Sequence, residues 1–149
     1  MIIWILAAVL LTAADQLIKY IVINNISPTD MIEVIPGILN FVYVKNTGAA
    51  FSLLSGKTFI LSIVSLAVCV FLVWYLLKKK PKSKFFMLSL GMILGGAVGN
   101  LIDRVFRGFV VDYIEACFIN FPVFNLADIA ITLGAVMLMI YVIFFEENQ

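Results

Sequence analysis

The sequence predicts an all-α polytopic membrane protein with four transmembrane helices, and three observations lead to this fold class. The 149 residues are 64% hydrophobic and only 13% charged, and their mean hydropathy of +1.14 is far above that of soluble domains. Four apolar segments each approach the ~20 residues that cross a ~30 Å hydrocarbon core. A lysine-rich linker separates the second segment from the third.

The expected spans form one membrane-embedded domain, 1–149, and they lie at 2–23, 58–77, 86–103 and 122–145. The first span contains the small-residue sequence Thr12-Ala13-Ala14, which is typical of signal-peptide cleavage sites. It has no basic start, however, and apolar residues resume at Leu17. We therefore expect a retained helix rather than a cleaved leader. The second span carries no charge and is expected to be scaffold.

The linker 78–85 sets the expected orientation in the membrane. It contains five lysines, and short lysine-rich loops stay in the cytoplasm. Both termini are then cytoplasmic, and the segments 24–57 and 104–121 face outward. In the outward segments, 38–44 and 109–114 are rich in β-branched and aromatic residues and predict strands. The segment 49–54 predicts a short amphipathic helix at the interface.

Composition also excludes several kinds of site. The net charge of +1 argues against a nucleic-acid surface, and the absence of histidine with only two cysteines argues against a metal site built from those residues. Cys69 lies inside a span and Cys117 between spans, so no disulfide is expected. We expect no cofactor and no metal.

Polar residues inside the spans are the candidates for function. Asn125, Asp128 and Thr132 fall on one face of the fourth span, and a carboxylate in hydrocarbon usually pairs, protonates or lines a cavity. In the first span, Asp15 and Lys19 form an i,i+4 pair. That pair either neutralises itself to pack the bundle or orders the outer mouth of a site, and the sequence leaves both interpretations open.

The third span combines small and polar residues. Gly91, Gly95 and Gly99 recur every four residues, which predicts close helix packing and a groove that admits a peptide backbone. Its outer end carries a polar cluster formed by Asn100, Asp103 and Arg104. Taken alone, Arg104 is interpreted as a snorkelling cation or a partner of Asp103. Asn46 and Gly48, in the outward segment, are taken alone as turn formers.

Two carboxylates are expected to meet near the outer surface. Asp112 lies among apolar residues in the strand 109–114, and Asp128 lies six residues into a helix that we expect to begin near Pro122. Burial and mutual repulsion separate the pKa values of such a pair, so one carboxyl holds a proton while the other activates water. This is the chemistry of aspartic proteases.

Five blocks of residues resemble one known family, the lipoprotein signal peptidases (signal peptidase II). The blocks occur in family order, cover essentially the whole chain and are DQLIK (15–19), NTGAAF (46–51), GGAVGNLIDR (95–104), VVDYI (110–114) and FNLADIA (124–130). The resemblance implies four helices with a small extracytoplasmic β-cradle and a short amphipathic helix. It also implies an aspartic endopeptidase with Asp112 and Asp128 as the catalytic dyad.

The resemblance further implies which residues order the site or bind substrate: Asp15, Lys19, Asn46, Gly48, Asn100, Arg104, Asn125 and Ala127. The implied substrate is a prolipoprotein whose cysteine already carries diacylglycerol, cut just before that cysteine in the bacterial inner membrane, near its outer face. Membrane lipid is the other expected partner, and we expect a monomer. The alternative from another class is a small proton-coupled transporter or channel that uses the carboxylates as relays.

Overall fold

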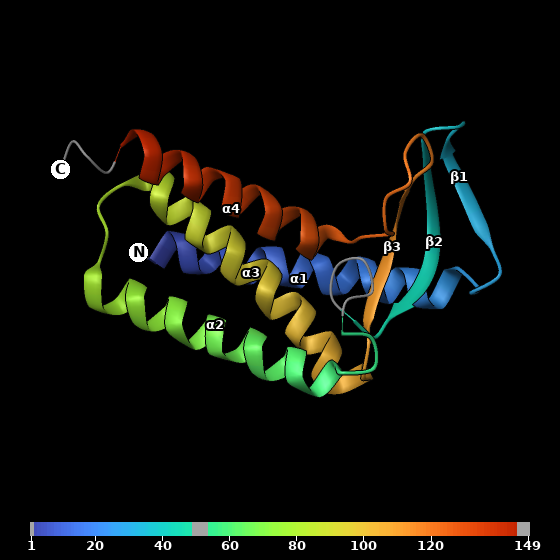
Figure 1. Cartoon of the computed structure of the whole chain (residues 1–149), viewed down its shortest axis with the longest axis horizontal. Coiled ribbons are helices and arrows are strands. Elements are labelled where there is room, and N and C mark those ends of the chain that lie inside the picture. Colours follow the sequence, from blue (N-terminus) through green and yellow to red (C-terminus); the bar gives the residue numbers. More distant parts are fainter. Residues whose placement is uncertain (1, 49–53, 146–149) are drawn as a thin grey trace.

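The computed structural model describes residues 2–48 and 54–145. Within them the chain forms four helices, each long and apolar enough to cross a membrane. They are α1 (Ile2–Asn25), α2 (Thr58–Lys79), α3 (Lys84–Arg107) and α4 (Leu126–Phe144) (Figure 1). The four predicted spans are therefore confirmed, with α3 extending four residues beyond the expected end at 103. The chain is a multi-pass membrane protein.

The centre of the bundle is α3, which packs on α1, α2 and α4 and lies between α2 and α4 in Figure 1. Its glycines allow this close packing. A Cβ atom added to Gly95 would lie 2.9 Å from the carbonyl oxygen of Ala8 on α1, and one added to Gly96 would collide with Ala127 on α4. The predicted close packing is thus confirmed. The predicted peptide groove on this face is wrong, because α1 and α4 already fill it.

The segments 24–57 and 104–121 contribute a three-stranded antiparallel sheet in the order β1-β2-β3. The strands are β1 (Met31–Ile35), β2 (Leu39–Asn46) and β3 (Val110–Ala116), and the sheet lies across one end of the helices (Figure 1). The two predicted strands correspond to β2 and β3, whereas β1 was not predicted. Of the expected amphipathic helix at 49–54, residues 49–53 lie outside the described residues and Leu54 lies in a turn.

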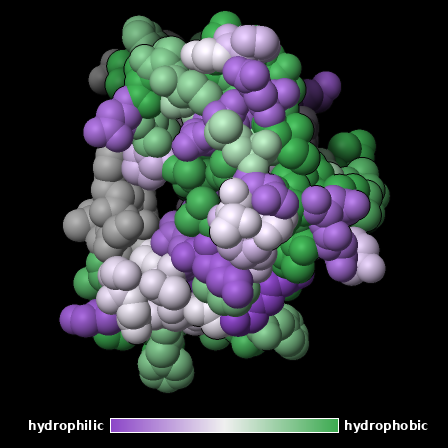
Figure 2. All heavy atoms as spheres, turned by 90° about the vertical axis from the view of Figure 1, so that its right-hand side faces the viewer, coloured by the Kyte–Doolittle hydropathy of each residue, from purple (hydrophilic) through white to green (hydrophobic). Residues whose placement is uncertain are grey.

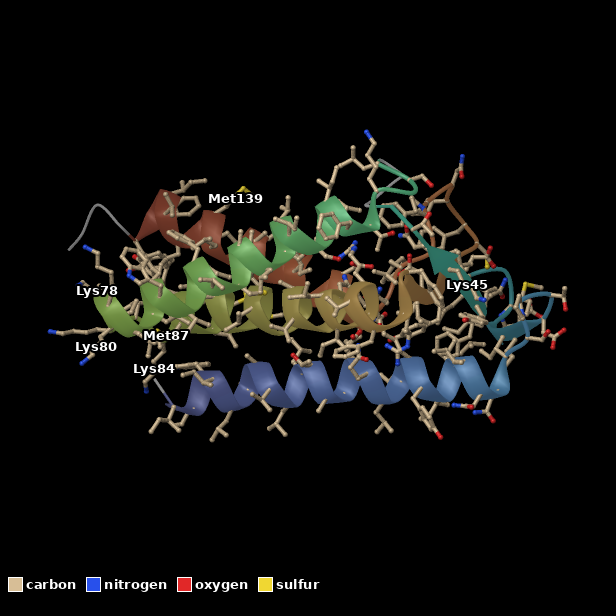
Figure 3. The ribbon with its side chains drawn as sticks, turned by 90° about the horizontal axis from the view of Figure 1, so that it is seen from below. Lys45, Lys78, Lys80, Lys84, Met87 and Met139 are labelled. Atoms are coloured by element: carbon tan, nitrogen blue, oxygen red, sulfur yellow. The ribbon has the colours of Figure 1, made fainter. Side chains whose placement is uncertain are left out.

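The lysine-rich linker lies at the end of the bundle opposite the sheet. Figure 3 marks Lys78, Lys80 and Lys84 at that end and Lys45 of β2 at the other. The start of α1 and the end of α4 also lie on the lysine side (Figure 1). The sheet and the lysines therefore occupy opposite ends of a bundle whose helices span a membrane.

The last helix begins later than expected, at Leu126 rather than near Pro122. Asn125 is the N-cap, and its side chain accepts the Asp128 N–H while the Asp128 carboxylate accepts the Asn125 N–H. This reciprocal capping box fixes the start of the helix. The preceding residue, Phe124, forms an isolated bridge with Ile114 of β3. Asp128 thus lies in the first turn of α4, shallower than the six residues of helix that we expected.

Candidate active site

Two aspartates meet where β3 passes the start of α4. Asp112 of β3 and Asp128 of α4 both line a cavity of about 880 Å³. Asp112 is almost fully buried, and Asp128 is half-buried. Residues 110–113 of β3 are all buried, so buried side chains lie on both faces of the strand. Both faces of this strand are therefore interior at the point where Asp112 projects.

Asn125 joins the two carboxylates. Its side-chain Nδ2 donates to Asp112 Oδ1 at 2.7 Å, and its backbone N–H donates to Asp128 Oδ2 at 3.2 Å. It is fully buried, and it sits at the N-terminus of α4, where the partial positive charge of a helix stabilises an anion such as the carboxylate of Asp128. The residue that begins the helix therefore also sets the relative position of the two acids.

Two further asparagines each contact one carboxylate. Asn46 Nδ2 donates to Asp112 Oδ2 at 2.8 Å, and Asn100 Nδ2 donates to Asp128 Oδ1 at 2.8 Å. Each of the three amides has its orientation fixed by a donor that faces its oxygen. These donors are the Gly48 N–H for Asn46, the Lys19 ammonium for Asn100 and the Asp128 N–H for Asn125. Because an N–H must face the amide oxygen, the NH₂ group of each amide must face a carboxylate.

Lys19 and Asp15 support this arrangement from α1. The Lys19 ammonium is completely buried and contacts Asp15 Oδ2 at 2.8 Å, Asp103 Oδ2 at 3.0 Å and Asn100 Oδ1 at 2.9 Å. Its three N–H groups therefore have three acceptors. Asp15 Oδ1 accepts the Ala127 N–H at 3.1 Å. The predicted Asp15–Lys19 pair is present, and it both packs the bundle and contacts residues beside the two acids.

Asp103 is part of the same network, although the sequence did not single it out as a site residue. One of its oxygens accepts the backbone N–H of Val111, next to Asp112, at 3.0 Å. The other pairs with Arg107 and accepts from Gln16. The i,i+4 spacing of Asp103 and Arg107 is a signal that could have found this pair. Asp103 does not pair with Arg104, contrary to one interpretation of that arginine.

Arg104 lines the cavity together with both aspartates. Its Nη2 donates to the carbonyl oxygen of Gly48 at 3.2 Å, so it reaches the loop that follows β2 rather than snorkelling to the surface. Among the described residues, its Nε is buried and has no hydrogen-bond partner. Gly48 thus connects to the site twice, through Arg104 and through Asn46.

The electrostatics of Asp112 follow from its surroundings. Burial raises the pKa of Asp112 to about 7, and the nearby charge of Asp128 adds to the rise, while the hydrogen bonds from Asn46 and Asn125 and the charge of Lys19 oppose it. Asp112 therefore holds a proton in much of the population at neutral pH. A protonated carboxyl beside a second carboxyl is the arrangement that acid/base catalysis by two aspartates needs.

The cavity is mainly apolar away from the acids. Its walls include Val64 and Val68 of α2, Ala97 of α3 and Ile131 of α4. These residues come from three helices, so the cavity lies where α2, α3 and α4 face one another. From the sheet end, hydrophilic residues run through the middle of the surface, and hydrophobic residues gather to the right of them (Figure 2). In the described part of the chain, no group of three or more histidine, cysteine or acidic side chains could hold a metal ion.

Comparison with known proteins identifies the family. Residues 7–144 match the family model described as signal peptidase (SPase) II. This chain belongs to the signal peptidase II family. Curated proteins named lipoprotein signal peptidase are similar to it along nearly their whole length. The one from Enterococcus faecalis is 40% identical over 99% of this chain and 91% of its own, and the one from Clostridioides difficile is 44% identical over 98% of each.

Solved structures share the signal peptidase II fold of this chain. One, titled as a bacterial membrane enzyme structure at 2.3 Å resolution, has a TM-score of 0.93 at 34% identity and covers all of this chain and 93% of its own. A second with the same wording at 1.9 Å has a TM-score of 0.88 at 35% identity, over 97% and 95% of the two chains. The fold of this chain is thus shared with solved membrane enzymes that are only about one third identical to it in sequence.

Proposed function

We propose that this chain is an intramembrane aspartic endopeptidase that removes the signal peptide from diacylglyceryl-modified prolipoproteins, cutting just before the lipidated cysteine. Family membership supports the peptidase class. The observation that carries the aspartic mechanism is the pair of carboxylates, Asp112 and Asp128, joined by Asn125 inside a cavity. The transporter alternative gains nothing from the relatives above, which are named as peptidases.

In this mechanism Asp128 is the base and Asp112 the acid. The start of α4 stabilises a negative charge on Asp128, which takes a proton from water as the water attacks the scissile carbonyl. Asp112, whose pKa of about 7 leaves it protonated in part of the population at neutral pH, donates a hydrogen bond to the developing oxyanion in that form. Asn46, Asn100 and Asn125 hold the carboxylates in place through their fixed NH₂ groups. Arg104 holds the loop at Gly48 and has donors left for substrate carbonyls.

The cavity suits a substrate that arrives from the membrane. Its apolar walls are formed by membrane-spanning helices, α2, α3 and α4, so a signal-peptide segment and acyl chains can enter sideways without leaving hydrocarbon. The acids lie at the outer end of these helices, on the side of the sheet, where water is available for hydrolysis. A substrate with a membrane-embedded signal segment and an exported mature part matches this geometry.

Mass spectrometry of a purified precursor tests this proposal directly. A diacylglyceryl-modified prolipoprotein incubated with the purified protein in detergent should yield two products, a free signal peptide and a mature chain that begins at the lipidated cysteine. The unlipidated precursor serves as the control and should remain intact. An unchanged lipidated precursor, or a cut at another bond, would contradict the proposed activity.

The pH dependence of turnover follows from Asp112. As the pH rises through about 7, the pKa of Asp112, this residue loses the proton that the mechanism requires, so cleavage should decline on the alkaline side. Asn46→Ala removes a hydrogen bond that lowers this pKa, and the alkaline limb of its profile should therefore move to higher pH. Initial rates measured across pH 5 to 9 would reveal the shift. A limb that stays in place or moves to lower pH contradicts the assigned role.

We propose that the sheet is outside the cell and the lysine-rich linker inside, which follows from the lysines by the positive-inside rule. Cys117 is exposed beside the sheet, whereas Cys69 is buried in α2. A membrane-impermeant maleimide applied to intact cells should therefore label the native chain at Cys117. The variant Cys117→Ser/Lys82→Cys, with its thiol in the linker, should be labelled only after the membrane is opened. The opposite pattern would invert the topology.

A further inference from the structure

Tyr113 follows Asp112 in β3 and contacts the chain on both sides of Asn125. Its backbone N–H donates to the carbonyl oxygen of Phe124 at 3.0 Å, and its hydroxyl oxygen accepts the backbone N–H of Leu126 at 3.2 Å. Asn125, held between these two bonds, is the residue that contacts both carboxylates. The side chain of Tyr113 therefore reaches the same turn that carries Asp128.

The hydroxyl contact completes the capping of α4. The first N–H groups of a helix have no partner inside the helix. In α4, the N–H of Leu126 is accepted by Tyr113, that of Ala127 by Asp15, and that of Asp128 by the Asn125 side chain. Two of these three acceptors come from other elements, β3 and α1, so the start of α4 is attached to its neighbours.

The tyrosine ring itself is held firmly. Tyr113 is 2% exposed and packs with Val22, Ile26 and Val111, and its ring meets that of Phe41 edge to face at 6.2 Å. Burial raises the pKa of Tyr113 to about 12, so the hydroxyl stays neutral at physiological pH. A fixed ring with a neutral hydroxyl holds its hydrogen-bond partner in one place.

We infer that Tyr113 is a positioning residue of the active site, whose hydroxyl fixes the first turn of α4 and so sets where Asp128 stands relative to Asp112. This inference rests on the proposed peptidase activity and deepens it. Catalytic groups displaced by as little as 1 Å can lose about 100-fold in rate. A bond that locates this turn therefore acts on turnover more than on substrate binding.

Two variants remove the same bond from its two ends. Tyr113→Phe deletes the acceptor and keeps the ring. Leu126→Pro deletes the donor. Leu126 is the first helical position, where proline is favoured. It follows Asn125, whose extended backbone (φ −136°, ψ 178°) suits a following proline. Tyr113→Phe should lower kcat by about three- to tenfold, the loss of one modest hydrogen bond, with KM within about twofold of that of the unaltered protein. Leu126→Pro also places the ring Cδ where the N–H pointed, against the Tyr113 hydroxyl that lies 3.2 Å from the nitrogen, so it should lose at least as much.

The two losses should not multiply, because the double variant lacks both the hydrogen bond and the clash: it should have the kcat of Tyr113→Phe. Leu126→Ala, which keeps the N–H, and Tyr20→Phe, which removes an exposed hydroxyl, are the matched controls and should keep full kcat. All rates are measured on the cleavage of the lipidated precursor per folded protein. Should Tyr113→Phe not fold, Leu126→Pro decides, with Leu126→Ala as its control.

Unchanged kcat in Tyr113→Phe, or multiplied losses in the double variant, would overturn the inference. So would a loss confined to thermal stability, which is what a purely structural hydroxyl would give. The failure of the proposed function is a separate result, because in that case the unaltered protein would itself leave the precursor uncut.

Discussion

Asp112→Asn and Asp128→Asn are each expected to reduce precursor cleavage by at least about 100-fold, within the range that acid/base groups contribute to catalysis. An amide keeps the shape of a carboxyl but can neither take a proton from water nor hold the proton that Asp112 carries near neutral pH. The fold should survive both changes. The new amide at Asp112 still accepts one of the two hydrogen bonds that Asn46 and Asn125 donate there. The loss of the other is offset because the repulsion between two buried acids disappears.

The measurement is the rate of release of the signal peptide, set beside thermal unfolding of each variant in the same detergent. Asp30→Asn, which alters an exposed carboxylate outside the site, is the matched control and should keep full activity. Melting temperatures within a few degrees of the unaltered protein would attribute the loss to chemistry. Substantial turnover by either dyad variant would exclude that residue from the mechanism.

The sequence predicts the fold well where one physical signal dominates. Four apolar runs of membrane length fixed the helices, and β-branched segments located β2 and β3. β1 was missed because all five residues of Met31–Ile35 are exposed. A strand without a buried face does not need the alternation of apolar and polar residues by which strands are recognised in a sequence. The start of α4 was misplaced because Asn120 and Pro122 resemble a helix start, whereas the capping box of Asn125 and Asp128 sets the actual one.

The site is harder to predict, because its contacts cross between elements far apart in the chain. Spacing alone brought out the Asp15–Lys19 pair, which is local. It could not reveal that Lys19 also reaches Asn100 and Asp103 on α3, 81 residues away in the first case. The glycine stripe of α3 shows the same limit. The spacing of the glycines predicts that another backbone lies close to α3. It does not tell whether that backbone belongs to a neighbouring helix or to a substrate.

The network around Lys19 leads to the second large expected effect. Lys19→Met should lower the free energy of unfolding by about 3–5 kcal/mol, the range found when one partner of a buried ion pair is removed. Methionine fills a similar volume, but Asp15 then keeps a buried charge with no cation, and Asp103 keeps only Arg107. Asn100 also loses one of the two donors to its amide oxygen and keeps only the longer bond from Asn125 Nδ2, so its NH₂ group is held less firmly on Asp128 and activity should fall as well.

Thermal unfolding in detergent separates the charge of Lys19 from its packing. Lys19→Met/Asp15→Asn removes the uncompensated carboxylate and keeps an oxygen for the Ala127 N–H that Asp15 accepts, so the double variant should melt above the single one. Lys82→Met, at an exposed lysine of the linker, should stay within about 0.5 kcal/mol of the unaltered protein. If Lys19→Met melted like the unaltered protein, or if the double variant melted below the single one, charge compensation would not be what Lys19 contributes. If Lys19 neutralises the two buried carboxylates, the double variant should melt between the single variant and the unaltered chain.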